Sequence, residues 1–370
     1  MMKRAYTLCR LCGIDIKMHI SFLLLPLLFG WAYGVRGLFV VGFVFTCVTL
    51  HELSHALQAR RFGLGVQEIL LYPIGGVANL RSFGHRPSQE FITAMAGPLF
   101  NFVSAGLLFL PALHWLGAPT LLHRDVMWQM SLDTWPKTFA SCFWINPLLG
   151  VFNLLPAFPM DGGRILRSAL AQRLTYQRAT RIAVRLGHLC AVGLAAWGLF
   201  SSPPNLLLVV IAIFVYTAAS RERSAVEVRA TLEPLSVSEV CSRSYVALSM
   251  ESTVGQALDA LLRTAQTDVA VVDGERLVGL LPRAAVVQAV HHGGLTTPVR
   301  SLVRRDAPRV EAGDSLLCAY QLMEESGWQT VPVMQEDRLL GLITLDDLSR
   351  VYAVMSASPS FAGGFGAVPR

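Results

Sequence analysis

The stretch VVGFVFTCVTLHELSHALQARRFG, residues 40–63, joins an apolar run to a cluster of ionisable side chains. The first half carries no charge and is typical of the interior of a membrane helix. In the second half His51 and His55 are four residues apart, so on a helix both imidazoles lie on one face and can bind one metal ion. Glu52 beside them can hold and deprotonate a water on that metal. Because ionisable groups inside a membrane are costly, we favour a metal site over histidines that are only hydrogen-bonded.

The composition predicts a membrane domain followed by a soluble one. The chain has 370 residues, of which 53% are hydrophobic and 15% are charged, whereas soluble domains are about 25% charged. Long apolar runs end near residue 220, and charged residues then recur every few positions. The end of the chain is rich in Gly, Ser and Pro, which is typical of disorder. We predict a membrane domain at 1–220, a linker at 221–233, a soluble domain at 234–353 and a disordered tail at 354–370.

Six apolar segments, taken with their flanks, approach the ~20 residues that a bilayer requires. They cover residues 20–33, 38–59, 91–113, 139–155, 186–200 and 206–219. Lysine and arginine gather at the N-terminus and in the loops after the second and fourth segments, which by the positive-inside rule are cytosolic. We therefore predict a multi-pass protein of the cell membrane, with its N-terminus, C-terminus and soluble domain in the cytosol. The net charge of +6 comes largely from these flanking residues, so we expect no nucleic-acid partner.

A short segment between the second and third spans has the features of a hairpin. EILLYPIGGVANL, residues 68–80, is too short to cross a bilayer and is interrupted by Pro73, Gly75 and Gly76. Apolar residues on both sides of a Gly-Gly pair indicate a hairpin or a re-entrant loop. Such backbone is stable at membrane depth only when it is buried in protein or lines a wet cavity.

A third protein ligand is needed for a catalytic zinc, in addition to an open position for water. The best candidate is Asp161, in the run FNLLPAFPMDGGR at residues 152–164. Proline and glycine interrupt the helix there, which can place the carboxylate in a cavity. The alternative is that Asp161 only caps a helix at the membrane boundary. Asp161 and His51 lie toward the same cytosolic side, so they can meet if the irregular segment dips inward.

Together these motifs resemble the site-2 protease family of intramembrane zinc metalloproteases, over about residues 10–220. HELSH lies in one span and NLLPAFPMDGGR in a later one, with a Gly-Gly loop between them. The run MAGPLFN at 95–101 also resembles the A-G-P-x-x-N segment of that family. The resemblance implies one Zn²⁺ per chain, held by His51, His55 and Asp161, with Glu52 as the general base.

The same resemblance implies further functional residues. Asn153 is a candidate catalytic residue that steadies the substrate or the oxyanion; its alternative role is a hydrogen bond between helices. Gly75, Gly76 and Asn101 are candidate substrate-binding positions. A helical substrate hides its peptide bonds, so an open edge strand beside the zinc can capture an extended segment by β-augmentation. The alternative is a loop that is only packed between helices.

The soluble domain contains an internal repeat. DVAVVDGERLVGL at 268–280 aligns without a gap with TVPVMQEDRLLGL at 330–342. Each copy reads helix, strand, turn, strand and helix, which indicates a duplicated α/β unit. The unit resembles a pair of CBS domains, a family whose pairs commonly bind adenosyl nucleotides and often dimerise.

The two copies differ at the positions where that family contacts its nucleotide. In the second copy GLITLDD matches the family's G-x-[IV]-[ST]-x-x-D pattern, which implies contacts from Thr344 to phosphate and from Asp347 to ribose. The first copy has Pro282 and Ala285 at these two positions. At most one conventional site for an adenine nucleotide therefore remains, and a structural or docking module is the alternative.

The predicted fold is a polytopic all-α membrane domain of about six transmembrane helices, with a short re-entrant β-hairpin or loop, followed by a soluble α/β CBS pair. The predicted function is that of an intramembrane zinc endopeptidase in the lipid bilayer, which cleaves transmembrane segments of membrane-anchored proteins in regulated intramembrane proteolysis. Nucleotide or partner binding to the CBS pair regulates it, and a homodimer can form through that pair. The alternative is a CBS-gated ion transporter or channel. Transporters often show repeated halves, and residues 1–220 show none.

Overall fold

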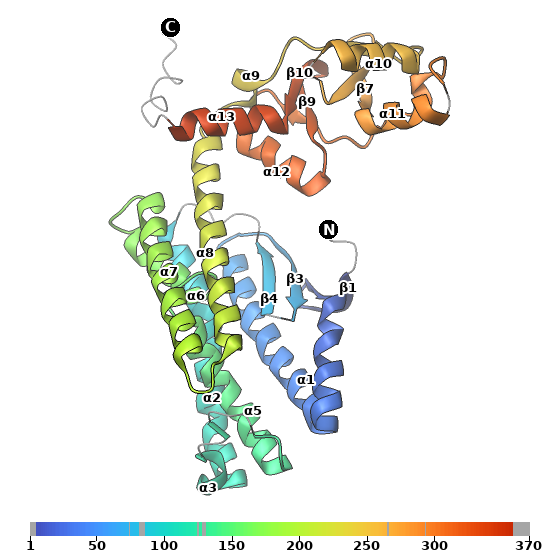
Figure 1. The fold of residues 1–370 in the computed structure, drawn as a ribbon. Helices are drawn as coiled ribbons and strands as arrows, with labels where there is room; N and C mark the ends of the chain where they lie inside the picture. The colour runs from blue at the N-terminus through green and yellow to red at the C-terminus, as the bar shows by residue number, and fades with distance from the viewer. Residues whose placement is uncertain are drawn as a thin grey trace. The chain divides into compact units, whose positions relative to one another are not determined.

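The structure is a computed structural model that describes residues 5–357 except 74, 81–85, 124–125, 128–130, 265 and 293. The chain forms two units, Met1–Ser224 and Ala225–Arg370, which we describe separately (Figure 1). The boundary falls inside helix α8 (Leu206–Leu232), so most of the predicted linker is helical. Residues 358–370 of the predicted disordered tail lie outside the described part of the chain.

The first helix of the first unit is bent and contains both of the first two predicted spans. The short helix η1 (Ile20–Leu23) leads into α1 (Leu24–Arg61), which is 38 residues long. Gly34, with φ 60° and ψ −142°, interrupts the helical backbone between the two spans. Glycine tolerates this conformation because it has no Cβ atom. The two predicted spans are therefore two arms of one kinked helix.

The remaining helices of the first unit are α2 (Pro87–Leu116), α3 (Ala118–Leu121), α5 (Trp135–Asn153), α6 (Asp161–Leu170), α7 (Tyr176–Phe200) and the first part of α8. Three helical segments among the described residues are long and apolar enough to cross a membrane: Ile20–Arg61, Pro87–Leu116 and Tyr176–Phe200. Leucines along them are widely exposed, including Leu107 at 73% and Leu110 at 70%. Exposed apolar surface on this scale marks a membrane-facing region. The chain is therefore an integral membrane protein.

A four-stranded sheet accompanies these helices in the order β1 (Ala5–Leu11), β2 (Ile14–His19), β3 (Val66–Tyr72) and β4 (Gly75–Leu80). Strands β3 and β4 form an antiparallel hairpin, and β2 runs parallel to β3. The Gly-Gly pair, where we predicted the break, instead forms the first two residues of β4. The all-α prediction omitted β1 and β2. Their signal is the alternation of apolar Ile14 and Ile16 with charged Asp15 and Lys17, a period of two residues that is typical of a half-buried strand.

The buried face of this sheet packs on the C-terminal arm of α1. The residues of this apolar cluster are Ile14, Ile16, Val66, Ile69 and Leu71 from the sheet, and Leu53, Ala56 and Ala59 from the helix. Small alanines on the helix allow the strands to approach it closely. The cluster fixes the hairpin against the turn of α1 that carries HELSH.

The second unit has the predicted duplicated pattern. The first copy contains α10 (Val254–Arg263), β6 (Asp268–Asp273), β7 (Arg276–Pro282) and α11 (Arg283–His292). The second contains α12 (Leu316–Ser326), β9 (Thr330–Gln335), β10 (Arg338–Thr344) and α13 (Leu345–Ala357). Each sheet gains a third, parallel strand, β5 (Ala247–Ser249) beside β6 and β8 (Val310–Glu311) beside β9.

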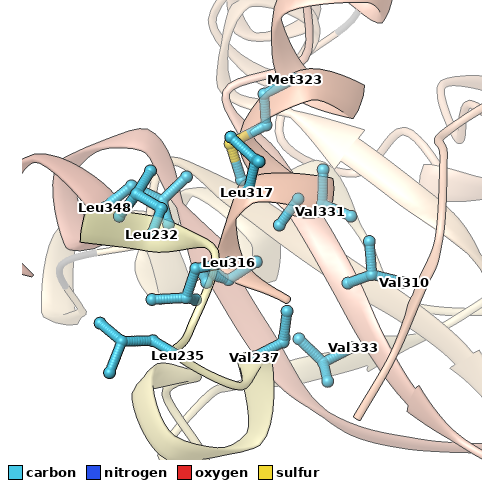
Figure 2. Packing of buried hydrophobic residues seen from close by; sticks show 12 residues of the cluster. Leu232, Leu235, Val237, Val310, Leu316, Leu317, Met323, Val331, Val333 and Leu348 are labelled. Atoms are coloured by element: carbon cyan, nitrogen blue, oxygen red, sulfur yellow. The ribbon is translucent and has the colours of Figure 1, made fainter. Parts of the chain in front are cut away.

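The end of α8 belongs to the core of the second unit. Leu232, the last residue of α8, is 1% exposed and lies in a buried cluster with Leu316 and Leu348 of the second copy (Figure 2). Leu235 and Val237, the latter in the short helix α9 (Val237–Val240), extend the same cluster. One continuous helix therefore begins in the first unit and ends in the core of the second unit.

Candidate metal centre

Three side chains from distant parts of the sequence converge in the first unit. The Nε2 atoms of His51 and His55 are 3.1 Å apart, and Asp161 Oδ2 lies 3.1 Å from the first and 3.0 Å from the second. All three residues are buried, with exposures of 4%, 6% and 8%. Within the described ranges they are the one group of three or more His, Cys, Asp or Glu residues that could hold a metal ion.

The three donor atoms fit a zinc ion. Zinc–nitrogen bonds of 2.0–2.1 Å in tetrahedral geometry place ligand atoms about 3.3 Å apart, close to the observed spacing. His55 Nδ1 lies 2.7 Å from the carbonyl oxygen of Thr93. A carbonyl can only accept, so Nδ1 carries the proton and Nε2 directs its lone pair toward the other two donors. The donor set also leaves a fourth position for water or substrate.

Local sequence explains why Asp161 reaches the histidines. Asp161 is the first residue of α6, and the chain before it folds back in tight turns at Leu155–Ala157 and Ala157–Met160. A Cβ atom on Gly162 would lie 2.2 Å from the carbonyl oxygen of Leu155, and one on Gly163 would lie 2.8 Å from the carbonyl carbon of Ala157. Only glycine permits this approach, so the Gly-Gly pair lets α6 begin directly against the preceding turn.

Gly97 on α2 is a site residue that our sequence reasoning missed. A Cβ atom there would lie 2.3 Å from His55 Nε2 and 2.6 Å from His51 Nε2. Helix α2 thus passes so close to the two donor atoms that no side chain fits between the helix and these atoms. In the sequence, only a resemblance to a family segment singled out the run MAGPLFN that contains this glycine. The signal for a role of its own was a glycine inside an apolar helix, which costs helix stability and so indicates a packing need.

Glu52 lies against the hairpin. A Cβ atom on Gly76 would lie 2.6 Å from Glu52 Cγ, so strand β4 contacts the predicted base directly. Gly75 and Gly76 pair with Tyr72 and Leu71 of β3. Strand β4 is the last strand of its sheet, so its other edge has no strand partner among the described residues.

The two predicted asparagines lie in different environments. Asn101, one turn beyond Gly97 on α2, is 0% exposed, and within the described structure neither its Oδ1 nor its Nδ2 has a hydrogen-bond partner. A buried amide without partners is costly, so this side chain is suited to meet a water or a substrate group. Asn153 is the half-buried last residue of α5. Among the described hydrogen bonds of the three donor side chains, none runs to Asn153.

In the second unit the predicted nucleotide contacts lie together but bond to each other. The backbone N–H and the Oγ1 of Thr344 donate to Asp347 Oδ2, at 2.9 Å and 2.6 Å. Arg350 donates to the other oxygen of Asp347 at 2.8 Å. This arrangement caps the start of α13, and it satisfies the two side chains without a ligand.

A cavity of about 710 Å³ in the second unit lies elsewhere, against the first copy of the repeat. Its lining includes buried Asp268, Arg283 at the start of α11, and Arg304, whose guanidinium carbon lies 4.7 Å from the ring centre of Trp328. Trp328 and Gln329 come from the second copy. Burial raises the pKa of Asp268 above its ordinary value. The cavity therefore combines an aromatic wall with two cationic side chains.

Known proteins resemble both units. Residues 38–194 match peptidase family M50, and residues 237–292 and 299–354 each match the CBS domain. A zinc metalloprotease of Methanocaldococcus jannaschii is 29% identical over 96% of this chain and 98% of its own length. Stage IV sporulation protein FB of Bacillus subtilis is 30% identical over 50% of this chain and 60% of its own length. A solved site-2 protease from M. jannaschii is 31% identical, covers 59% of this chain and 95% of its own, and has a TM-score of 0.44.

Proposed function

Because the chain is a zinc metalloprotease of peptidase family M50 joined to a pair of CBS domains, we propose that it is an intramembrane endopeptidase that cleaves transmembrane segments of membrane-anchored proteins. The observation that carries this proposal is the position of the donor histidines. His51 and His55 are buried in a helix that is long and apolar enough to cross a membrane. A substrate reaches them only if it also enters the bilayer, which favours transmembrane segments over soluble peptides.

In this proposal one zinc ion per chain is held by His51, His55 and Asp161. Zinc bound there supplies Lewis-acid polarisation of the scissile carbonyl. Glu52, next to His51 on α1, accepts the proton of the attacking water and returns it to the amine leaving group, as a general base and then a general acid. Asn153 donates an amide hydrogen bond to the substrate or to the developing oxyanion.

The substrate is bound as an extended strand. A transmembrane helix hides its peptide bonds in its own hydrogen-bond ladder, so a part of it must unwind before cleavage. Strand β4 offers the edge that pairs with the unwound segment by β-augmentation, and Gly75 and Gly76 keep that edge free of side chains beside Glu52. The unpaired amide of Asn101 is a further partner for a polar group of the substrate.

The proposed topology has six crossings. They are the two arms of α1, then α2, α5, α7 and the apolar part of α8, and the β3–β4 hairpin re-enters beside the metal centre. The distribution of lysine and arginine favours both termini and the CBS pair in the cytosol of a cell-membrane protein.

Regulation is proposed to act through the CBS pair, by an adenine nucleotide or by a partner, with a homodimer formed through the same pair. Two places are candidates for the nucleotide. The resemblance favours Thr344 and Asp347, whereas the cavity lies beside Trp328 and Asp268. The volume of the cavity falls in the range of small-molecule sites, so we favour the cavity.

The decisive test is Glu52→Gln in full-length protein reconstituted with a transmembrane substrate. We expect the zinc content to stay constant, and the cleavage rate to fall by at least ~100-fold because the general base is lost. Glu251→Gln, which changes an exposed carboxylate of the second unit, is the control and leaves the rate unchanged. Undiminished cleavage in Glu52→Gln contradicts the proposal, and zinc-dependent ion flux without cleavage favours the transporter alternative.

A further inference from the structure

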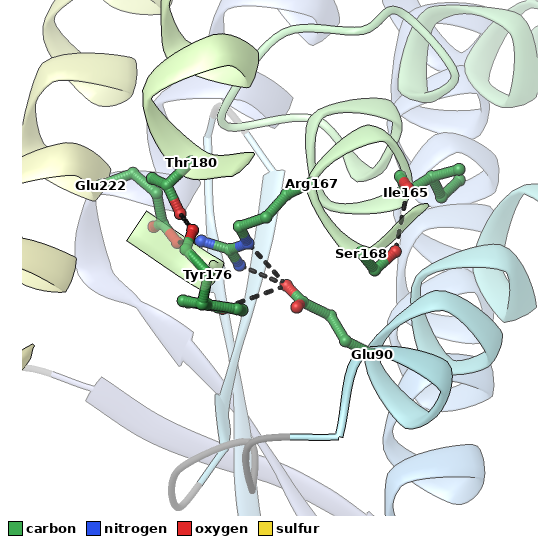
Figure 3. A network of polar contacts seen from close by, with 7 residues as sticks. All are labelled: Glu90, Ile165, Arg167, Ser168, Tyr176, Thr180 and Glu222. Carbon is green, nitrogen blue, oxygen red and sulfur yellow. Dashed lines mark hydrogen bonds and ion pairs between the residues drawn. The ribbon is translucent and has the colours of Figure 1, made fainter. Parts of the chain in front are cut away.

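A buried arginine fixes the helix that carries Asp161. Arg167 lies six residues after Asp161 on α6, and its side chain is 4% exposed. Its Nε donates to Glu90 Oε1 at 2.9 Å, and its Nη2 donates to the same oxygen (Figure 3). Its Nη1 donates to Glu222 Oε1 at 2.5 Å. The guanidinium thus joins α6 to the start of α2 and to α8.

Two aromatic rings add to these bonds. The guanidinium carbon of Arg167 lies 4.9 Å from the ring centre of Phe158 and 4.8 Å from that of Tyr176, both within cation–π range. Phe158 is 1% exposed and precedes Asp161 by three residues. Tyr176 is the first residue of α7. Arg167 therefore also holds the turn before Asp161 and the next helix along the chain.

The position of Asp161 depends on how α6 is packed. Asp161 stands in the first turn of a helix of only ten residues, after a stretch with few regular backbone hydrogen bonds. Six residues along a helix span about 9 Å, so a shift of the Arg167 end moves the carboxylate directly. A buried charge that loses a partner is costly, which makes the cluster resist such shifts.

The Glu222 bond extends the cluster to a helix that leaves the membrane unit. Glu222 lies on α8, three residues before Ala225, where the second unit begins. The last residue of the same helix, Leu232, is part of the core of the second unit (Figure 2). A change in that core that turns or shifts α8 acts on the bond between Glu222 and Arg167.

We propose that Arg167 is a positioning residue that holds Asp161 at the two histidines and, through Glu222, makes the position of Asp161 depend on α8. The inference rests on the proposed function insofar as Asp161 is taken as a zinc ligand. It does not depend on the identity of the protein substrate.

The test compares zinc binding in full-length variants. Arg167→Met keeps an unbranched apolar stem but removes the guanidinium, with its charge and all five donors. We expect at least ~10-fold weaker zinc binding in competition with a chelator, the scale of losses when groups that orient metal ligands are removed. We also expect faster amide hydrogen exchange at residues 154–170 of the metal-free protein. Arg173→Met, an exposed arginine beyond the end of α6, leaves both quantities unchanged.

Two more variants separate positioning from general stability. Arg167→Lys keeps the charge without the planar fork, so it restores part of the zinc affinity. Glu222→Gln weakens zinc binding less than Arg167→Met does, and it raises exchange at residues 154–170. In cleavage assays Arg167→Met lowers kcat while KM stays constant.

Wild-type zinc affinity and exchange in folded Arg167→Met overturn the proposal, even if the thermal midpoint falls. Unchanged exchange in Glu222→Gln overturns the link to α8. If the wild type binds zinc but cleaves no transmembrane substrate, the proposed function fails while the zinc measurements still decide the role of Arg167.

Discussion

The two units differ in how the residues of their predicted motifs are arranged in the structure. In the membrane unit, His51 and His55 come from one motif and Asp161 from another, and their donor atoms lie within 3.1 Å of one another. In the CBS unit, Thr344 and Asp347 form the better-preserved motif, yet the cavity lies against the first copy, where that motif is degraded. The predicted residues therefore converge on one group of donor atoms in the first unit, whereas in the second unit they lie apart from the lining of the cavity.

The difference follows from what burial demands. Ionisable side chains inside an apolar helix are expensive, so histidines kept there need a common partner, and few arrangements provide one. A threonine and an aspartate at the start of a soluble helix can cap that helix through local hydrogen bonds. The backbone N–H of Asp347 donates to Thr344 Oγ1, and the Asp347 carboxylate accepts from Thr344, so the pair caps α13 without any ligand. Ionisable side chains in an apolar helix therefore indicate a functional site more strongly than polar side chains at the start of a soluble helix do.

The largest effect should come from Gly97→Ala. This variant tests whether the positions of His51 and His55 depend on the absence of a side chain at Gly97. The new methyl group would lie 2.3 Å from His55 Nε2, so α2 or the histidines must move. We expect zinc affinity to fall by at least ~100-fold and cleavage to become undetectable, as measured by chelator competition and by product formation.

Gly106→Ala is the matched control, because it lies on the same helix and its Cβ would meet no atom within 4 Å. It should keep full activity and a slightly more stable helix, since alanine has the higher helix propensity. Tight zinc binding in Gly97→Ala would show that the metal lies elsewhere.

Much of the fold could be predicted from the sequence, because hydrophobic run length and repetition are direct signals. The CBS repeat was predicted from the alignment of 268–280 with 330–342, and the structure has the same order of elements. The first two predicted spans are the arms of one helix that is kinked at Gly34. The lengths of the apolar runs do not distinguish a kinked helix from two separate helices. Strands β1 and β2 form a local hairpin, but β2 joins the sheet by pairing with β3, about 50 positions away, and local sequence does not report that pairing.

The candidate site was only partly predictable, for a geometric reason. The spacing of His51 and His55 determines their common face on a helix, so the pair could be found from local sequence. Gly97 and Arg167 act through contacts across helices. A glycine inside an apolar helix indicates close packing, but no local pattern shows which residues lie opposite it. Their roles depend on which helix surfaces face each other, and this becomes visible only in the folded chain.

The second largest effect is expected for Gly76→Ala, which tests the contact between the hairpin and the base. Its Cβ would lie 2.6 Å from Glu52 Cγ, so the Glu52 side chain must shift. A displacement of about 1 Å at a reacting group costs on the order of 100-fold in rate. We expect that loss in kcat with zinc content unchanged, which separates this variant from Gly97→Ala.

Gly42→Ala on α1 is the control, since its Cβ would meet no atom within 4 Å, and it should match the wild type. Equal losses of zinc in Gly76→Ala and Gly97→Ala would mean that the hairpin supports the metal ligands and does not act on the base alone.

A smaller effect distinguishes the motif from the cavity in the CBS unit. If AMP binds in the cavity, Trp328→Ala should weaken it about tenfold, the value of one lost stacking contact. Thr344→Ala should leave the affinity unchanged. Isothermal titration of the full-length protein with AMP measures both, and Trp328→Phe, which keeps an aromatic face, should retain most of the binding.

The reverse result, with a loss in Thr344→Ala and none in Trp328→Ala, would assign the nucleotide to the second copy. It would make the two units alike, since the motif would then predict the site in both. Absence of AMP binding in the wild type would favour the docking-module alternative for the pair.

The smallest effect concerns pH and Asp268, the buried carboxyl group of the cavity. Burial raises its pKa in the folded protein, whereas the unfolded chain keeps the ordinary value of about 3.9. Between these two values the folded state binds a proton that the unfolded state has released. The free energy of unfolding therefore falls as pH rises through the raised pKa, and the full stability is present only below the unfolded value.

Asp268→Asn should remove this dependence, because asparagine stays neutral and keeps an oxygen that can accept from the backbone N–H of Arg283, as Asp268 does at 3.3 Å. We expect the variant to gain stability relative to the wild type as pH rises from 4 toward 7. Pulse proteolysis in urea, with the fragment after residue 225 as the readout, measures the second unit within the full chain. Asp259→Asn, at an exposed carboxylate paired with Arg263, serves as the control. A pH dependence shared by Asp268→Asn and the wild type would show that a group other than Asp268 titrates.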